Sequence, residues 1–322
     1  MSDDLVAAAR PAGVPAPRLT DALTSAAGYA LAEKADATRR AYRADLSRFC
    51  AWCESVGAAT LPAEASTVAA YLAHCADSAL SVSTIQRRAA AIGYAHKLAG
   101  HASPSAAETV KAVLRGIRRK VGAATKPKAP ATAPIVAAMT KRTPATLAGK
   151  RDRAMILLGF AAALRRSELI DLKVNAIERT AEGLIVHIGK SKTDQEGLGE
   201  SIAVPRGKKL RVVEALDDWL AASAIVDGPL FRRIAKGGTL LDCGLSGQSV
   251  ALIVKRWAKA AKLDLKLFSG HSLRAGFVTS ALDEGADIFK VMDVTRHREV
   301  KTLRVYDRRS KAFKNHAGKG FL

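Results

Sequence analysis

In the first third of the chain, apolar residues recur every three or four positions, which is the spacing of an amphipathic helix. The stripe from Tyr42 to Val56 is followed by Gly57, a residue type that commonly ends helices. Similar stripes predict three further helices, over 66–75, 83–98 and 105–117. We therefore expect a purely helical domain over residues 20–122, preceded by a flexible N-terminus rich in Ala and Pro, residues 1–19.

The last of these helices has a recognisable start signal. Ser105 and Glu108 have the S-x-x-E spacing of a capping box, in which each side chain accepts a bond from a backbone N–H of the first turn. The sequence therefore predicts that this helix begins at Ser105.

Residues 123–133 separate two regions of different pattern. Ala, Pro and Lys fill this stretch, a composition typical of an extended, semi-rigid linker. The elements predicted after it are a buried helix, three antiparallel strands and two further helices, at 153–163, 174–179, 184–188, 201–204, 210–224 and 249–262. We therefore expect a second domain, residues 134–322, that combines helices with a small antiparallel sheet, so that the chain as a whole is mainly α.

The net charge of the chain indicates what kind of partner it binds. The 322 residues include 51 Lys and Arg against 30 Asp and Glu, a formal charge of +21, and the excess is spread along the chain. Such a balance favours a polyanion as partner, and nucleic acid is the commonest one. A merely solvated basic surface is the alternative, which charge alone does not exclude. The cations predicted to bind DNA are Arg87, Arg88, Lys111, Arg115, Arg118, Arg119, Lys255 and Arg256.

Several other classes of protein are disfavoured. No apolar run reaches the ~20 residues of a membrane-spanning helix, and Asp3 and Asp4 stand where a secretory signal carries cations, so we expect a cytoplasmic protein associated with the nucleoid.

Cys50 and Cys53 have C-x-x-C spacing and could form a zinc site with the pair at 74–75, but Cys53 falls on an apolar stripe, which favours a buried thiol. With no glycine-rich phosphate loop either, we expect no cofactor.

One cluster of residue types is suited to phosphate chemistry. His271 and Arg274 lie three positions apart, so they face the same side of one helical turn, and His297 and Tyr306 follow on what we predict to be the next two short helices. Two cations upstream could complete this set, Arg165 and Lys192, the latter in the loop between the second and third predicted strands.

Taken in order, these residues resemble the active site of the tyrosine recombinases, the phage integrase family. The resemblance spans about residues 38–306, and its specific part is the spacing from His271 to Tyr306. It implies a helical, SAM-like core-binding domain and a mixed α/β catalytic domain. It also implies site-specific recombination through a 3′-phosphotyrosine intermediate and a Holliday junction, by a homotetramer on double-stranded DNA with paired inverted-repeat half-sites. In solution the protein would be a monomer or a weak dimer.

The resemblance assigns a role to each residue. Tyr306 would be the nucleophile and His271 would accept its proton. Arg165 and Arg274 would offset the charge that the non-bridging phosphate oxygens gain in the transition state. His297 would donate a hydrogen bond to the phosphate.

The leaving group and the acidic position complete this assignment. Lys192 would protonate the departing 5′ oxygen, and only the resemblance selects it over its neighbour Lys190. Glu168, three residues after Arg165, would orient the site without reacting. The family's usual glycines are replaced by Ala163 and Arg296, and Arg166 stands at a typically apolar position, which concerns local packing.

Two alternatives remain open at this point. A type IB topoisomerase uses a similar constellation as a monomer to relax DNA, although a helical domain before the site and a short tail after Tyr306 fit a recombinase better. A DNA-binding protein that no longer cleaves is the other. The basic tail, residues 307–322, contains Phe313, which the resemblance predicts to dock into the next subunit of a cyclic assembly.

Overall fold

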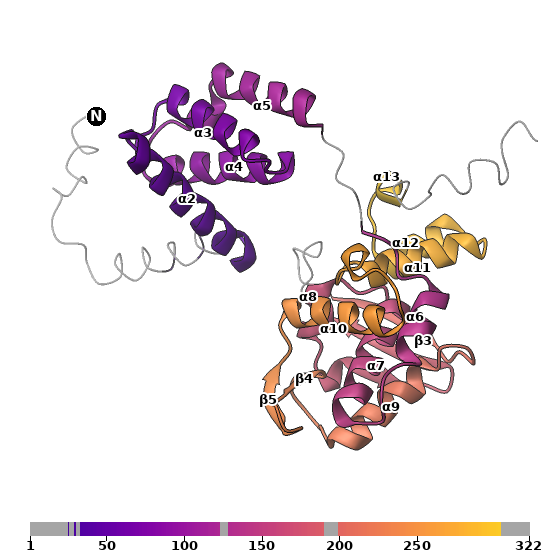
Figure 1. The fold of residues 1–322 in the computed structure, drawn as a ribbon. Helices are drawn as coiled ribbons and strands as arrows, with labels where there is room; N and C mark the ends of the chain where they lie inside the picture. Colours follow the sequence, from indigo (N-terminus) through magenta and orange to yellow (C-terminus); the bar gives the residue numbers. More distant parts are fainter. Residues whose placement is uncertain (1–24, 26–28, 30–32, 123–127, 190–198, 304–322) are drawn as a thin grey trace, which may run out of the picture. The chain divides into compact units, whose positions relative to one another are not determined.

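The computed structural model describes residues 25, 29, 33–122, 128–189 and 199–303. The chain divides into two compact units, residues 1–126 and residues 127–322 (Figure 1). None of the described helices is long and apolar enough to cross a membrane.

Within its described residues, the first unit contains helices and no strand. Its elements are α2 (Asp36–Val56), α3 (Ala65–Asp77), α4 (Val82–Leu98), the short 3-10 helix η1 (Pro104–Ala106) and α5 (Glu108–Val121). The predicted stripe of α2 is buried at Phe49 and Cys53, which pack against Tyr71 and Leu72 of α3. Gly57 ends α2 in the left-handed conformation, as its position after the stripe predicted.

The capping box predicted at Ser105 is wrong. Helix α5 begins at Glu108, three residues later, and Ser105 lies in η1. The Ser105 hydroxyl donates to the backbone oxygen of Ala89 on α4 at 2.7 Å, and the Glu108 carboxylate pairs with Arg115. The physical reason is that α4 offers the hydroxyl an acceptor, so that Ser105 joins two helices and caps neither.

The second unit has helices around a three-stranded sheet. Its elements are α6 (Ala133–Thr140), α7 (Leu147–Ala161), α8 (Arg166–Asp171), η2 (Val174–Ala176), β1 (Ile177–Arg179), β2 (Gly183–Ile188), β3 (Glu200–Pro205), α9 (Val212–Ser223), β4 (Arg232–Ile234), β5 (Leu240–Gly244), α10 (Gly247–Ala260), η3 (Leu265–Leu267), α11 (Ser272–Asp283), α12 (Ile288–Thr295) and α13 (Val300–Leu303). Helix α7 is the centre of the core, with Met155 through Leu158 fully buried, and it packs against α6, α9 and α11.

The sheet is antiparallel in the order β1-β2-β3. Leu184, Val186 and Ile188 of β2 are buried, as are their neighbours Ile202 and Val204 of β3. Ile188 pairs with Glu200 at the end of this ladder. The first three residues of the predicted first strand form η2 instead.

The predicted linker is partly a component of the second unit. The backbone N–H of Ala129 donates to Leu267 at 2.8 Å, and that of Ala131 donates to Ser272 at 2.8 Å. Ala131 is fully buried against α11, where Gly276 leaves room for it: a side chain at Gly276 would place its Cβ 1.8 Å from the Ala131 oxygen. Residues 128–133, which the sequence predicted as linker, thus pack on the second unit.

Candidate active site

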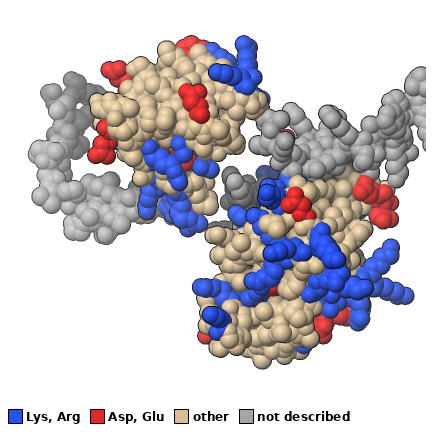
Figure 2. Space-filling model, viewed as in Figure 1, with Lys and Arg blue, Asp and Glu red and all other residues tan. Residues whose placement is uncertain are grey.

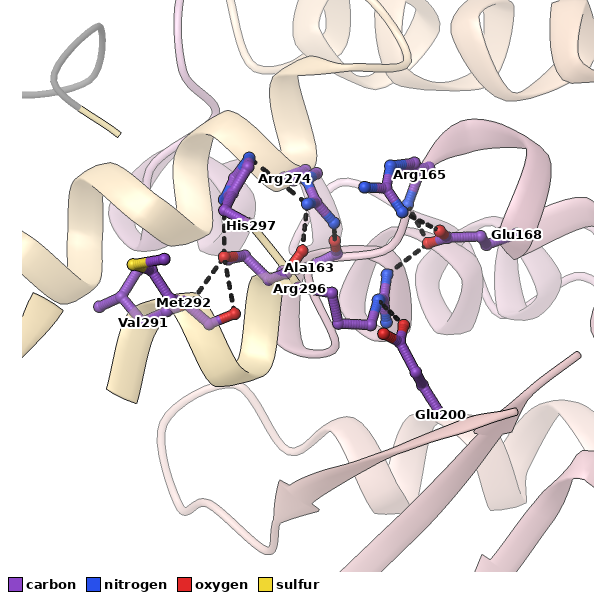
Figure 3. A network of polar contacts seen from close by, with 10 residues as sticks. Ala163, Arg165, Glu168, Glu200, Arg274, Val291, Met292, Arg296 and His297 are labelled. Carbon is purple, nitrogen blue, oxygen red and sulfur yellow. Dashed lines mark hydrogen bonds and ion pairs between the residues drawn. The ribbon is translucent and has the colours of Figure 1, made fainter. Parts of the chain in front are cut away.

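Arg165 lies at the turn between α7 and α8, as the N-cap residue of α8 (Figure 3). The buried carboxylate of Glu168 holds it twice: Oε2 accepts the Arg165 backbone N–H at 2.7 Å, and Oε1 accepts its guanidinium Nη1 at 2.7 Å. A bond of this kind between ionised groups is about twice as strong as one between neutral groups. The orienting contact expected of Glu168 toward Arg165 is therefore present.

Arg274 lies in the first turn of α11 and is only 1% exposed. Its Nη1 donates to the backbone oxygen of Ala163 at 2.8 Å, and its Nη2 donates to the backbone oxygen of Thr295. These two carbonyls belong to the ends of α7 and α12. Arg274 thus joins three helices, and the two bonds fix the plane of its guanidinium.

His297 follows α12 and is not part of a helix, which corrects the prediction that it lies on one. The Thr295 hydroxyl donates to the Val291 oxygen at 2.6 Å, so the oxygen of this hydroxyl can accept from His297 Nδ1, which lies 2.7 Å away. His297 Nε2 lies 3.4 Å from Nη2 of Arg274, a donor. This network assigns the proton of neutral His297 to Nδ1 (Figure 3).

The electrostatic environment disfavours the protonated form of both histidines. Desolvation, together with the charges of Arg274 and Arg165, lowers the pKa of His297 to about 4. Desolvation and the same two arginines also lower the pKa of His271, which immediately precedes α11. The charges of Arg165 and Arg274 therefore disfavour the protonated form of both histidines, and Arg274 also lies within 3.4 Å of His297.

We expect His297 to make stability depend on pH. The unfolded chain takes up a proton near the ordinary pKa of 6.5, whereas the folded protein does so only near 4. Stability is therefore fully present above pH 6.5 and is lost as the pH falls toward 4. His297→Gln removes the pH-dependent contribution of this histidine to the free energy of unfolding. Between pH 7 and pH 5 the thermal unfolding midpoint of the variant should therefore fall less than that of the parent. Subtracting the two curves cancels the other titrating groups, and parallel curves would contradict the assignment.

The two positions where the family's usual glycines are replaced share an unusual backbone conformation. Ala163 has φ 47° and Arg296 has φ 56°, both in the left-handed region that favours glycine. Both flank the bonds of Arg274, since Ala163 supplies one acceptor and Arg296 follows Thr295, which supplies the other. The replacements therefore leave the backbone path of the site in place.

Arg296 is a residue of this site whose role the sequence did not reveal. Its side chain is 5% exposed, its Nη2 donates to Glu168 Oε2 at 2.5 Å, and its Nε lies 3.1 Å from Glu200 Oε2 (Figure 3). Desolvation lowers the pKa of Arg296, and Glu168 and Glu200 oppose that shift. The only signal in the sequence was a large cation at a position where glycine is usual.

Two of the sequence-predicted residues, Lys192 and Tyr306, lie outside the described residues, as does the competitor Lys190. The structure therefore brings together Arg165, Glu168, His271, Arg274 and His297. Phe313 and the rest of the basic tail also lie outside the described residues.

The predicted DNA-binding cations of α4 both contact residues of the first unit. Arg88 is 13% exposed, and its Nη1 donates to the Tyr71 hydroxyl at 3.0 Å. Arg87 donates through Nε to Asp45 at 2.7 Å, and Asp45 is 1% exposed. The Arg88 guanidinium lies over the Tyr71 ring, 5.8 Å from its centroid, so the fold uses this cation for packing, and its contact with DNA stays a prediction.

The other predicted DNA-binding cations are at the surface. Arg118 and Arg119 are exposed on α5, as is Lys111, whereas Arg115 pairs with Glu108. On α10, Lys255 is half-buried and Arg256 lies 3.6 Å from the buried carboxylate of Asp152. Figure 2 shows Lys and Arg side chains gathered over α10 on the visible face of the second unit.

Comparison with known proteins identifies the class. Residues 133–312 match the phage integrase family, and residues 29–102 match the N-terminal SAM-like domain of phage integrases. The chain is 39% identical over 292 residues to an integrase/recombinase XerD homolog of Selenomonas ruminantium, over 88% of this chain and 85% of the relative. The recombinase Cre of Escherichia phage P1 is 27% identical over 284 residues, 80% of each chain. The chain therefore belongs to the phage integrase family.

It is accordingly a tyrosine recombinase, an enzyme that cleaves and rejoins DNA in site-specific recombination. These relatives favour recombination over relaxation by a type IB topoisomerase and over binding without cleavage.

The fold is similar to that of solved recombinases. A lambda integrase dimer bound to a COC′ core site has a TM-score of 0.60 at 15% identity, over 89% of this chain and 95% of that one. The XerH recombinase bound to a palindromic difH substrate has a TM-score of 0.56 at 16% identity, over 76% and 68%. The expected fold class, mainly α with a small antiparallel sheet, is confirmed.

Proposed function

We propose that this enzyme cuts double-stranded DNA by attack of Tyr306 on a backbone phosphate, forming a 3′-phosphotyrosine bond, and exchanges strands through a Holliday junction. The observation that carries this proposal is the pair of guanidinium groups of Arg165 and Arg274. Glu168 of α8 holds that of Arg165, and the carbonyls of Ala163 and Thr295 hold that of Arg274. A phosphate bound between them would accept hydrogen bonds from both guanidinium groups. Their positive charges would offset the charge on its non-bridging oxygens without a metal ion.

The histidines supply the proton chemistry of this proposal. A neutral imidazole can accept the tyrosyl proton, and the lowered pKa of His271 keeps it neutral at pH 7. Lys192 would protonate the 5′ oxygen as it leaves. Glu168 touches no substrate group in this scheme and acts by holding Arg165.

Double-stranded DNA is the proposed substrate. The lambda integrase and XerH structures contain double-stranded DNA, and the +21 charge of this chain suits the same partner. We propose that the target consists of paired inverted-repeat half-sites and that four copies assemble on two such sites. Head-to-tail docking of the tail at Phe313 would close this assembly.

The experiment that tests the function is strand transfer between two duplexes. The target is first found by footprinting the full-length protein on DNA flanking its gene, where paired inverted repeats are expected. Two labelled duplexes that carry this target should give recombinant products of new length. Relaxation of a supercoiled plasmid without recombinant products would favour the topoisomerase, and binding without a covalent adduct would favour a non-cleaving protein.

Salt dependence tests the cationic face of α5. A protein that neutralises Z phosphates shows a slope of about −0.9Z in log K against log salt concentration. Replacing Arg118 and Arg119 together by Gln should therefore flatten the slope by roughly 1.8 and change site preference little. A matched variant, Lys208→Gln with Lys209→Gln, removes the same charge from the exposed loop after β3 and should leave the slope close to that of the parent. Equal slopes in all three proteins would mean that this face of α5 is only solvated.

A further inference from the structure

Arg296 combines two features that each carry an energetic cost. Its backbone is left-handed at φ 56°, which an L-residue other than glycine adopts with strain. Its guanidinium is buried at 5% exposure, and among the described residues neither Nε nor Nη1 has a hydrogen-bond partner. Glycine would avoid both costs. A buried ion pair contributes little net stability compared with an apolar side chain of similar size, so stability alone does not explain the arginine.

The first contact of Arg296 reaches the catalytic arginine on the other side of the site. Oε2 of Glu168 accepts both from Arg296 Nη2 and from the backbone N–H of Arg165. With Oε1 bonded to the Arg165 guanidinium, the carboxylate has partners on both oxygens. Arg296 thus restricts the rotation of Glu168, and Glu168 sets the position of Arg165.

The second contact reaches the sheet. Arg296 Nε lies 3.1 Å from Glu200 Oε2, an ion pair that lacks the geometry of a hydrogen bond. Glu200 is the first residue of β3 and pairs in register with Ile188 at the end of β2. The chain that carries Lys192 joins β3 at Glu200. The side chain of Arg296 is therefore ion-paired with the residue at which β3 begins, and its backbone adjoins His297.

We propose that Arg296 is a positioning residue of the cleavage reaction: it ties together the segment of His297, the Glu168–Arg165 pair and the first residue of β3. One guanidinium thereby sets three parts of the site relative to each other (Figure 3). This inference rests on the proposed function, because the β3 contact matters for catalysis through the acid role of Lys192.

The two contacts have separable effects on the rate of covalent adduct formation with a nicked duplex that carries the target. Glu200→Gln removes one charge from a partly exposed side chain and keeps the Glu168 contact, so it should slow cleavage of ordinary DNA about tenfold. With sulphur at the bridging 5′ position the leaving thiolate needs no proton, and the rate should return to that of the parent.

Arg296→Gly relieves the backbone strain but frees Glu168, so it should slow cleavage roughly 10²-fold and recover only in part on the sulphur substrate.

Arg179→Gln is the matched control, because it removes an Arg–carboxylate pair, with Asp217 of α9, from the same sheet. It should leave both rates unchanged. The inference is overturned if Glu200→Gln and Arg296→Gly behave like the parent on ordinary DNA, or if both lose activity equally on the two substrates, as a general loss of stability would produce.

Failure of the proposed function gives different results. A parent protein that forms no adduct refutes the function itself. A Lys192→Ala variant that is not restored by sulphur refutes the assignment of the acid, whatever Glu200→Gln does.

Discussion

Tyr306→Phe is expected to abolish formation of the covalent protein–DNA adduct while DNA binding stays at the level of the parent. The substitution removes only the phenolic oxygen that would attack the phosphate, and the ring keeps its shape. A nicked suicide substrate traps the adduct because the cut strand diffuses away before it can be rejoined. The parent should give an adduct that resists denaturation, and the variant should give none.

Binding and cleavage are measured on the same DNA in this experiment. Equal retention of the parent and the variant in a gel-shift assay shows that the variant is folded. Tyr42→Phe, at an aromatic pair with Tyr94 in the first unit, is a matched control and should form the adduct normally. An adduct from Tyr306→Phe at the parent's rate would show that another residue is the nucleophile.

Arg274→Lys is expected to lower the cleavage rate by about 10³-fold. Lysine keeps the charge, but its ammonium group is a point donor and cannot span the Ala163 and Thr295 carbonyls as the guanidinium fork does. Both carbonyls would lose a partner, and the developing charge on the phosphate would lose an oriented donor. Because this loss concerns the non-bridging oxygens, sulphur at the bridging 5′ position should not restore the rate.

Lys192→Ala gives the opposite pattern in the same assay. Loss of a general acid costs roughly 10²–10⁴-fold on ordinary DNA, and the sulphur substrate should restore the rate because a thiolate leaves unprotonated. Lys190→Ala is the natural control, two residues away, and should cleave ordinary DNA at the parent's rate. If Lys190→Ala shows the loss and the rescue, the acid has been assigned to the wrong lysine.

Local patterns predicted the helices well because the side chains that a helix buries on one face recur every three or four residues. The stripe from Tyr42 to Val56 and the apolar run at Met155 through Leu158 both lie where helices are found. The sequence could not show what each polar side chain meets. Ser105 has the spacing of a cap, yet an oxygen of Ala89, distant in the sequence, determines its bond.

The same limit applies to the predicted cations and the site. Arg88 has the sequence context of a surface cation, and only the fold brings Tyr71 and Asp45 against it. The spacing of His271 and Arg274 indicated a shared face, whereas the role of Arg296 depends on Glu168 and Glu200, which lie far from it in the sequence. The short hairpin of β4 and β5 carried too few residues for a recognisable alternation.

The bonds of His297 have a consequence for the stoichiometry of DNA binding. In its neutral form this imidazole has one proton, and the bond to Thr295 Oγ1 uses it, while Nε2 faces a donor of Arg274. While the Thr295 hydroxyl donates to the Val291 oxygen, the ring can donate through Nε2 to a phosphate oxygen only by gaining a second proton. The bound phosphate, being negative, favours that uptake. If His297 donates to the phosphate in this way, binding near neutral pH should consume a proton from the buffer, and the heat of binding should change with the ionisation enthalpy of the buffer. The proton would then be a second ligand of the enzyme.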